Sequence, residues 1–310
     1  MIAAPARILI TGASGFVGRH PVTTLARAYP NATVLASWFD VRNTDAVDTA
    51  VRASAPDACI HLAAIASVPA ARQDETQAWQ VNLLGSIHLA RAILRHVPKC
   101  QMLFASSSEV YGESFRTGTP LDETAALAPT NVYSATKAAA EAAWSPPRTG
   151  CARCGPGIQP HRHQPVGRLR RGRVRPPDRT RRHRPAGPVM AVGNIDTWRD
   201  FLDVRDVCAA YVACLDRRET LEPGTIFNLA SGTPRRIGDI LATLLELAGV
   251  TVDVQVDQSR VRTTDLRTAS DDAARAAARL GWTSTVGWTQ TLQDVLDDWR
   301  RRVAAAPDAA

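Results

Sequence analysis

The sequence predicts an α/β fold, in which a doubly wound parallel sheet is followed by a smaller α/β lobe at the C-terminal end. The chain of 310 residues is long enough to form both parts. Short apolar runs that suit buried parallel strands alternate with amphipathic segments of helical period. The first run, Ile8 to Ile10, leads into Gly12, Gly15 and Gly18, which are spaced three residues apart. A strand, a glycine-rich turn and a helix in this order are typical of a Rossmann sheet.

The glycine turn indicates dinucleotide binding. Gly12 has access to backbone angles that are closed to other residues, Gly15 lets the main chain approach a pyrophosphate, and Gly18 lets the next helix pack closely on the strand. That helix directs its unpaired N–H groups at the phosphates, so an anion is held without a charged side chain. The residues of this turn that we expect to contact the coenzyme are Gly12, Ser14, Gly15, Phe16, Val17 and Gly18.

The next two strands supply the adenosine half of the predicted coenzyme site. The strand over residues 33–36 is followed by neither an acid nor a basic cluster that would read the ribose 2′ position, so the coenzyme is NADP or NAD. Asp40 and Val41 are placed at the adenine edge, with a solvated loop carboxylate as the alternative for Asp40. The strand over residues 58–64 ends in small residues that leave room for adenosine. Its expected contacts are Leu62, Ala63 and Ala64.

Several other polar residues are interpreted as structural. Pro21 lies in the early turns of the first helix and is expected to weaken or bend it. His61 is interpreted as a packed strand histidine, and Asn82 as a buried hydrogen-bonding residue. Asp203 and Asp206 begin a later helix, where carboxylates cap free N–H groups. Helices of the N-terminal part are expected over residues 16–28, 44–54 and 78–96.

The candidate catalytic residues follow a fourth apolar strand, at residues 102–105. That strand runs into a Ser-Ser-Ser-Glu-Val-Tyr-Gly stretch that includes Ser107, and ligands of such sheets bind beyond the carboxyl ends of the strands. Tyr133 opens an alanine-rich helix and Lys137 follows one turn later, so their side chains share a face. A phenol has a reference pKa of about 10 and needs a nearby cation to stabilise its ionised form, which Lys137 supplies.

Together, these motifs resemble the extended short-chain dehydrogenase/reductase family of nucleotide-sugar epimerases, dehydratases and reductases. The resemblance implies that Tyr133 protonates the substrate alkoxide, that Lys137 stabilises the tyrosinate and holds the coenzyme ribose, and that Ser107 binds the carbonyl oxygen. It also implies a catalytic role for Glu109, which stands where dehydratases keep the base that removes the C5 proton. Ser108 is placed at the substrate.

A second resemblance lies in the run from Gly193 to Val207. It is similar to the Gly-Asn-x-Asp-x-x-Arg-Asp-Phe-x-Asp-Val-x-Asp-Val run of GDP-sugar dehydratases and, most closely, of GDP-4-keto-6-deoxymannose reductases. Arg199 in this run either reaches the substrate diphosphate or holds the lobe together. Further on, the resemblance pairs Arg262 with the diphosphate and lets Asp265 accept a ribose hydroxyl, with exposed loop charges as the alternative.

The formal net charge of +7 comes from one segment of the chain. Residues 144–190 hold 12 Arg, 9 Pro, 6 Gly and a single acid, Asp178, whereas the rest of the chain has 25 basic and 29 acidic side chains. A nucleic-acid partner is therefore not expected. By composition the segment should be disordered. Cys151 and Cys154 with His161 and His163 have the spacing of a zinc half-site, but the surroundings offer no second shell, and no metal site is expected.

A frameshift in the coding sequence explains this segment better than a functional motif does. Residues 157–162 can be encoded by codons that, read one base later, give Ala-Phe-Asn-His-Thr-Gly. Relatives among the nucleotide-sugar reductases carry Arg-Pro-Phe-Asn-His-Thr-Gly at this place. The same shift over residues 164–184 permits an amphipathic helix. We therefore expect residues 1–147 to form the dinucleotide-binding domain, 148–187 to be anomalous, and 188–310 to form the substrate lobe with returning Rossmann elements.

The sequence thus predicts an NAD(P)H-dependent reductase that acts on the C4 keto group of a GDP-4-keto-6-deoxy sugar. The alternatives are a GDP-mannose 4,6-dehydratase or another nucleotide-sugar epimerase or dehydratase, a non-catalytic coenzyme sensor, and a coenzyme-binding protein whose catalysis is impaired by the disrupted segment. No signal segment and no apolar run near the roughly 20 residues of a spanning helix occur, so a cytoplasmic protein without a membrane partner is expected. The resemblance implies a homodimer.

Overall fold

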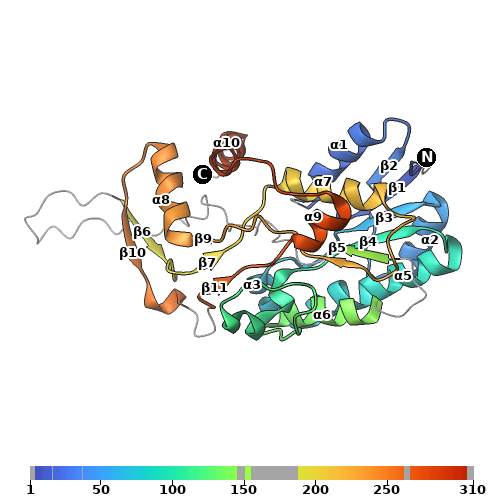
Figure 1. The fold of residues 1–310 in the computed structure, drawn as a ribbon, viewed down its shortest axis with the longest axis horizontal. Helices are drawn as coiled ribbons and strands as arrows, with labels where there is room; N and C mark the ends of the chain where they lie inside the picture. Colours follow the sequence, from blue (N-terminus) through green and yellow to red (C-terminus); the bar gives the residue numbers. More distant parts are fainter. Residues whose placement is uncertain are drawn as a thin grey trace, which may run out of the picture.

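A computed structural model describes residues 4–15, 17–36, 38–144, 188–261 and 266–305, together with the backbone of Cys151–Cys154. Its centre is a six-stranded sheet of order β2-β1-β3-β4-β5-β8, in which every neighbouring pair is parallel (Figure 1). The strand order runs outward from β1 in both directions, which confirms the predicted doubly wound sheet. The strands are β1 Arg7–Thr11, β2 Thr33–Ala36, β3 Ala58–His61, β4 Gln101–Ala105, β5 Cys151–Cys154 and β8 Ile226–Phe227.

Alternating side chains of β1 serve the two faces of this sheet. Ile8 and Ile10 pack in the core beneath α1 (Arg19–Ala28) and α7 (Val204–Asp216). Leu9 points to the opposite face. That face is covered by α2 (Thr44–Ser54) and α5 (Gly85–His96), which Figure 1 shows on the other side of the sheet from α1 and α7. A strand buried on both faces is apolar throughout, which is why the run from Ile8 to Ile10 predicts it well.

Two helix predictions need correction. The first helix starts at Arg19 and not at residue 16, so Pro21 falls in its first turn, where no N–H is needed by the helix and a proline costs little. The single helix expected over residues 78–96 is interrupted. It consists of α4 (Glu75–Trp79), a π-helical turn η1 (Gln80–Leu84) and α5.

The segment expected to be disordered provides one strand. The backbone of Cys151–Cys154 forms β5 and pairs with both β4 and β8. The backbone of these four residues completes the sheet between two strands that are not themselves neighbours. The structure does not describe residues 155–187 or the side chains of Cys151 and Cys154. The predicted frameshift and the zinc half-site therefore lie outside the described residues.

The C-terminal part has two small sheets. β6 (Val189–Val192) pairs in parallel with β10 (Asp253–Val256), and β7 (Trp198–Arg199) lies between β11 (Thr268–Ala269) and β9 (Arg235–Arg236). Three helices accompany these sheets: α8 Ile237–Ala248, α9 Ala274–Leu280 and α10 Trp288–Ala305. Phe201, Ile240 and Leu292 form a separate core between α8 and α10.

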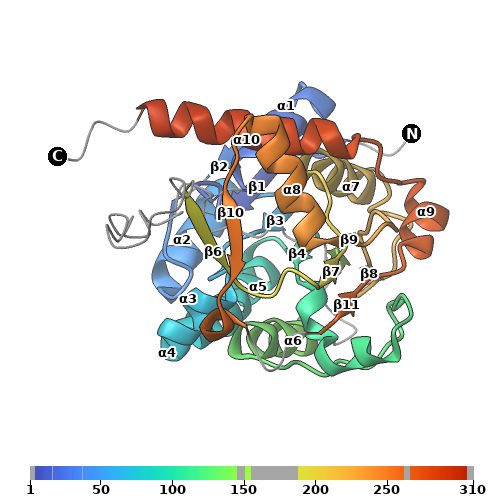
Figure 2. The ribbon, with the colours of Figure 1, turned by 90° about the vertical axis from the view of Figure 1, so that its left-hand side faces the viewer.

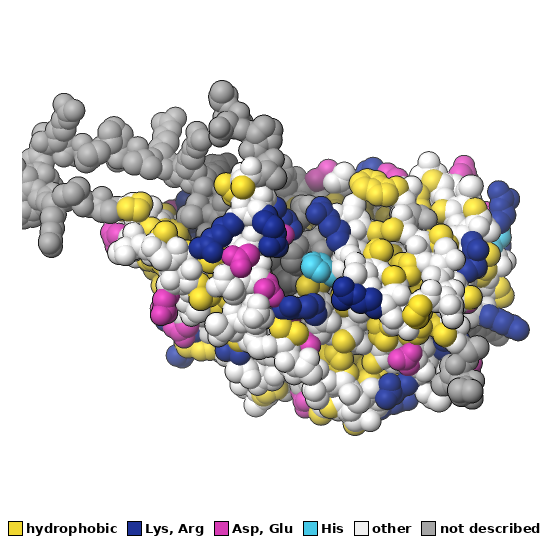
Figure 3. All heavy atoms as spheres, turned by 90° about the horizontal axis from the view of Figure 1, so that it is seen from above, with side chains coloured by type: hydrophobic (Ala, Val, Ile, Leu, Met, Phe, Trp, Pro, Cys, Tyr) yellow, Lys and Arg dark blue, Asp and Glu magenta, His cyan; other side chains and the backbone are white. Residues whose placement is uncertain are grey.

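Helix α10 crosses the top of the molecule, past α8 and near α1 (Figure 2). Viewed from above, this face carries basic and acidic side chains close together (Figure 3). On α10 they form ion pairs within the helix, such as Arg300 with Asp297 at 3.1 Å and Arg302 with Asp298 at 2.6 Å. Among the described residues, no helix combines the length and apolar character needed to cross a membrane.

Contacts between backbone groups join the C-terminal part to the central sheet. Leu121 lies in the loop between η3 (Gly112–Thr117) and α6 (Val132–Trp144), and its N–H donates to the Ser270 carbonyl at 3.0 Å. The N–H of Asp272 donates to the Leu121 carbonyl at 2.8 Å. The segment after β11 is therefore tied to the same part of the chain that carries the candidate catalytic residues.

Candidate active site

The glycine turn is shaped by close backbone contacts. Gly12 has a φ of +70°, and a Cβ at this residue would lie 2.6 Å from the Ala63 nitrogen. A Cβ at Gly18 would lie 2.2 Å from the Gly12 carbonyl oxygen. The Gly15 N–H donates to that same oxygen at 3.0 Å, which closes the turn. The turn at the end of β1 is therefore pressed against the end of β3, and side chains at Gly12 or Gly18 are sterically excluded.

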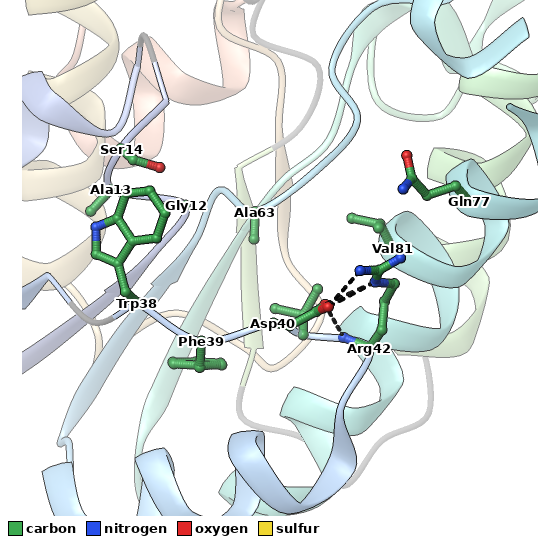
Figure 4. Close-up of a pocket in the computed structure, with 11 residues that line it drawn as sticks. Gly12, Ala13, Ser14, Trp38, Phe39, Asp40, Arg42, Ala63, Gln77 and Val81 are labelled. Atoms are coloured by element: carbon green, nitrogen blue, oxygen red, sulfur yellow. Dashed lines mark hydrogen bonds and ion pairs between the residues drawn. The ribbon is translucent and has the colours of Figure 1, made fainter. Parts of the chain in front are cut away.

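A cavity of about 290 Å³ opens beside this turn (Figure 4). Among its lining residues, Gly12, Ser14, Asp40, Val41 and Ala63 were predicted as coenzyme contacts. The cavity is also lined by residues that the sequence reasoning missed: Ala13, Trp38, Phe39, Arg42, Gln77 and Val81. Trp38 and Phe39 lie just after β2, at the carboxyl end of the strand, and this position could have indicated that they line the site.

Several predicted coenzyme contacts do not line this cavity. Val17, Leu62 and Ala64 are half-buried nearby, and Leu62 packs against the core beneath α1. Gly15 and Gly18 shape the turn from behind. Phe16 lies outside the described residues.

Asp40 is an exposed carboxylate that is paired with Arg42. Its carboxylate receives two hydrogen bonds from Arg42 Nε, at 3.0 and 2.9 Å, and one from the Arg42 N–H at 2.9 Å. These bonds hold the pKa of Asp40 below its usual value. In Figure 4 the pair lies between Ala63 and Val81, away from Ser14. Trp38, 84% exposed, lies beside Gly12 and Ser14 instead.

The candidate catalytic residues are buried at the same edge of the sheet. Tyr133, in the first turn of α6, is 3% exposed, and Ser107, just beyond β4, is 5% exposed. Burial raises the pKa of the Tyr133 phenol above its ordinary value, and a hydrogen bond with Ser107 opposes that rise. The Ser107 hydroxyl also accepts the Glu109 N–H at 3.3 Å. Ser108 is buried beside it.

Lys137 lies beneath Tyr133 on the same helix and is 1% exposed. Its ammonium donates to the Ala105 carbonyl at the end of β4, at 2.7 Å, and lies 4.6 Å from the centre of the Phe104 ring. Burial lowers the pKa of Lys137 to about 8, against the opposing effect of the Glu141 carboxylate. The Lys137 ammonium is thus held at the end of β4, one helical turn along α6 from Tyr133.

Glu109 is half-buried and accepts a hydrogen bond from Asn131 Nδ2 at 3.1 Å. Its carboxylate acts on the Tyr133 phenol by raising its pKa. Glu109 therefore belongs to the same group of side chains as Tyr133 and Ser107, as predicted.

The predicted substrate residues are less well assembled. Arg199 donates through one terminal nitrogen to the carbonyls of Trp198 and Leu266, at 2.8 and 2.9 Å, which favours its role in holding the lobe together. Arg262 and Asp265 lie outside the described residues.

The two aspartates after Arg199 have structural contacts. Asp203 caps α7 and accepts the Arg205 N–H at 2.8 Å. Asp206 accepts the N–H groups of Thr285 and Val286, each at 3.1 Å. Asp203 therefore caps the helix as expected, whereas the Asp206 carboxylate ties α7 to the loop before α10.

A doubly wound parallel sheet, a glycine turn beside a cavity, and a buried tyrosine–lysine pair at the same sheet edge define a dinucleotide-dependent enzyme of the short-chain dehydrogenase/reductase type. The chain belongs to the NAD dependent epimerase/dehydratase family, whose model matches residues 8–230. A model described as GDP-mannose 4,6 dehydratase matches residues 167–295. The chain is therefore a member of a family of NAD(P)-dependent nucleotide-sugar oxidoreductases.

Individual relatives match over nearly the whole chain. The GDP-6-deoxy-D-mannose reductase of Pseudomonas aeruginosa is 31% identical over 96% of this chain and 98% of its own. The structure of RMD from the same organism, complexed with NADPH, has a TM-score of 0.77 and 29% identity over 96% of this chain and 98% of that one. The UDP-glucose 4-epimerase of Thermus thermophilus, complexed with NAD, has a TM-score of 0.75 and 26% identity over 95% and 99%.

Proposed function

We propose that this protein reduces the C4 keto group of a GDP-4-keto-6-deoxy sugar with NADPH or NADH. The observation that carries the proposal is the buried Tyr133/Lys137 pair, which lies next to Ser107 at the sheet edge that also carries the glycine turn. The similarity to a GDP-6-deoxy-D-mannose reductase over nearly the full chain supports the substrate class.

The glycine turn fits a dinucleotide, because Gly12, Ala13 and Ser14 line the cavity beside it, where backbone groups can face a pyrophosphate. When bound, NAD(P)H supplies the hydride for C4. Tyr133 then donates its phenolic proton to the oxygen that has become an alkoxide. Lys137 stabilises the resulting tyrosinate and holds the coenzyme ribose, and Ser107 donates a hydrogen bond to the same oxygen. Ser108, Arg199, Arg262 and Asp265 are proposed to bind the nucleotide sugar.

The choice between NADP and NAD follows from the ribose end of the cavity. The related reductase and epimerase structures are complexes with NADPH and with NAD, respectively. In this chain the cavity's arginine, Arg42, is engaged by Asp40, and Trp38 stands beside Ser14. We therefore propose that either coenzyme is accepted, with Ser14 and Trp38 beside the ribose.

Substrate feeding tests the proposed function. The protein is incubated with GDP-mannose alone, and separately with a GDP-4-keto-6-deoxy sugar and NADPH or NADH, while coenzyme absorbance and the sugar product are followed. We expect coenzyme oxidation only with the keto sugar. No turnover of the keto sugar with either coenzyme, by a protein that binds the coenzyme, would contradict the proposal.

A specific residue supports a second candidate, a GDP-mannose 4,6-dehydratase. Glu109 lies close enough to Tyr133 to affect its pKa, as a base for the C5 proton would be placed. The match of residues 167–295 to the dehydratase model points the same way. Loss of water from GDP-mannose without added reductant would favour this candidate over the reductase.

Two non-catalytic candidates remain. One is a protein that binds the coenzyme but cannot complete the reaction because of the anomalous segment, and the other is a coenzyme sensor. Fluorescence titration with NADPH, combined with the turnover assay, distinguishes these two candidates from the reductase and the dehydratase. Binding without turnover of either sugar favours these candidates.

We further propose a homodimer that works in the cytoplasm. The α4–η1–α5 segment exposes Trp79, Leu84 and Leu94, at 38, 45 and 40% of their surfaces, which favours a partner on this side. Size-exclusion chromatography with light scattering measures the mass, and a monomer at assay concentration would contradict the dimer.

A further inference from the structure

A buried chain of hydrogen bonds crosses the sheet behind the coenzyme turn. It begins at Thr11, the last residue of β1, whose hydroxyl lies 2.6 Å from His61 Nδ1. His61, the last residue of β3, has its other ring nitrogen, Nε2, 2.9 Å from the Ser86 hydroxyl. The Ser86 hydroxyl lies 2.6 Å from the Asn82 carbonyl. All four residues are at most 1% exposed.

The direction of every bond in this chain is fixed by its last member. A carbonyl only accepts, so the Ser86 hydroxyl donates its hydrogen to Asn82. Ser86 must then accept from His61, which places the imidazole hydrogen on Nε2. Burial lowers the pKa of His61 to about 3, so the ring is neutral at pH 7 and carries a single hydrogen. Nδ1 is therefore an acceptor and receives the Thr11 hydroxyl hydrogen. The geometry therefore assigns one neutral tautomer to His61.

Each end of the chain continues into one half of the candidate site. At the coenzyme end, the Thr11 hydroxyl also accepts the N–H of Ala63, which lines the cavity, at 3.3 Å. At the other end, Asn82 Nδ2 donates to the Thr136 hydroxyl at 2.9 Å, and Thr136 donates to the Tyr133 carbonyl at 2.7 Å. Asn82 Oδ1 also accepts the Ile65 N–H at 2.8 Å, and Asn82 Nδ2 donates to the Ile65 carbonyl at 3.2 Å.

The π-helical turn places Asn82 and Ser86 at the required positions. Asn82 lies in η1, where the helix is wound more widely, and Ser86 lies in the first turn of α5. A π-turn inside a helix often marks a functional position. From this turn the Asn82 side chain contacts both Ile65 and Thr136, and its carbonyl accepts from Ser86, four residues later.

We propose that His61 is a positioning residue, whose Nε2–H tautomer couples the glycine turn and Ala63 to Asn82 and thus to the helix that carries Tyr133. The coupling rests on the proposed function only in assuming that the turn holds a coenzyme. His61 itself touches no reacting group. It fixes the position of Ala63 relative to α6, so that the two halves of the site are held in register.

The tautomer is measured first, on the unmodified protein. Nitrogen-15 NMR of the histidine rings, with His61 assigned by a His61→Gln variant, reports which ring nitrogen carries hydrogen at neutral pH. We expect the Nε2–H form. A predominant Nδ1–H form would overturn the proposal, and this result does not depend on coenzyme binding or on turnover.

The coupling is measured with Ser86→Ala, which removes a hydroxyl that does not line the cavity. Ser54→Ala is the matched control, because Ser54 is also a buried helical serine and its hydroxyl donates to the Val51 carbonyl, at 3.3 Å. We expect Ser86→Ala to weaken NADPH binding by about two- to tenfold, the range that the net free energy of one hydrogen bond supports. We also expect it to raise the Nδ1–H fraction of His61, whereas Ser54→Ala changes neither.

Thr11→Val gives a second test, because Thr11 lies at the opposite end of the chain of hydrogen bonds from Asn82. If both variants act through His61, the Thr11→Val/Ser86→Ala protein binds NADPH no more weakly than the worse single variant. Fully additive losses, or unchanged binding in Ser86→Ala, would contradict the coupling. An unmodified protein that does not bind NADPH would contradict the proposed function instead, and the tautomer measurement would still decide the role of His61.

Discussion

Tyr133 is the residue on which the proposed reaction depends most directly. It is buried, and its phenol is hydrogen-bonded to Ser107. Burial alone disfavours the tyrosinate, so the proton transfer requires a compensating charge, and Lys137 lies one helical turn away. The same burial that raises the pKa of Tyr133 also makes the positive charge of Lys137 effective at short range.

Replacing Tyr133 with phenylalanine removes the proton donor and little else. We expect kcat of Tyr133→Phe to fall by about 10²- to 10⁴-fold, the usual contribution of general acid catalysis, with NADPH binding retained. Tyr29→Phe is the control, because its hydroxyl also bonds in a buried site, to Asp216 at 2.8 Å, at the far end of α1. Full turnover by Tyr133→Phe would remove the mechanism.

The pKa of Lys137 predicts a pH dependence. Burial lowers this pKa to about 8, so the reduction should slow above about pH 8, as the cation is lost. The unfolded chain keeps this proton up to about pH 10.5, so the free energy of unfolding should rise with pH between these values. Rate profiles and urea titrations check both effects.

Lys137→Met should abolish both pH effects. Lys99, the other lysine of the chain, is exposed, and Lys99→Met should leave both profiles unchanged. A rate profile that stays flat well above pH 8 in the unmodified enzyme would contradict the role of the Lys137 cation.

At the scale of elements, the turn between β1 and α1 depends on close backbone packing. A Cβ at residue 18 would lie 2.2 Å from the Gly12 carbonyl oxygen, so Gly18→Ala must displace the turn. We expect a loss of about 1–3 kcal/mol in the free energy of unfolding, as for other overpacked sites, and weaker NADPH binding.

Gly287→Ala is the control for this substitution, since a Cβ at Gly287 would meet no atom within 4 Å. Thermal unfolding and fluorescence titration compare the two variants. Equal stability and equal NADPH affinity for both would show that the turn tolerates a side chain and would contradict its assigned packing.

The sequence predicted most of the elements because buried parallel strands and amphipathic helices have strong periodic signals. The helix Thr44–Ser54 was predicted with the bounds that the structure has. The π-turn η1 was missed, because its residues have the same apolar spacing as an ordinary helix. The strand Cys151–Cys154 was missed because its pairing with β4 and β8 is non-local, and its composition gave no strand signal.

The site was predictable where it depends on motifs and not where it depends on packing. Tyr133 is hydrogen-bonded to Ser107, and Lys137 lies one turn later on the same helix, with its ammonium on the Ala105 carbonyl. The pairing of Asp40 with Arg42 could not be predicted, because it depends on the path of a loop. His61 and Asn82 were correctly interpreted as buried polar residues, but their partners come from distant strands and helices that only the fold brings together.

At the scale of the whole molecule, the described parts of both domains fit one enzyme, whereas the composition of residues 144–190 does not. If the frameshift is correct, resequencing the gene across this region should reveal an extra or missing base in the region that encodes these residues. A single clean frame that encodes the present sequence, found also in independent isolates, would contradict it.

The central claim is that the carbonyl carbon C4 receives hydride from the nicotinamide at this site. The most direct measurement uses NADPH or NADH deuterated at nicotinamide C4 on the transferred face, with a GDP-4-keto-6-deoxy sugar, and locates the label in the product by NMR. We expect deuterium on C4 of the sugar, and loss of this product in Tyr133→Phe. Consumption of the keto sugar without deuterium at C4, or water loss from GDP-mannose alone with no use of added coenzyme, would contradict it.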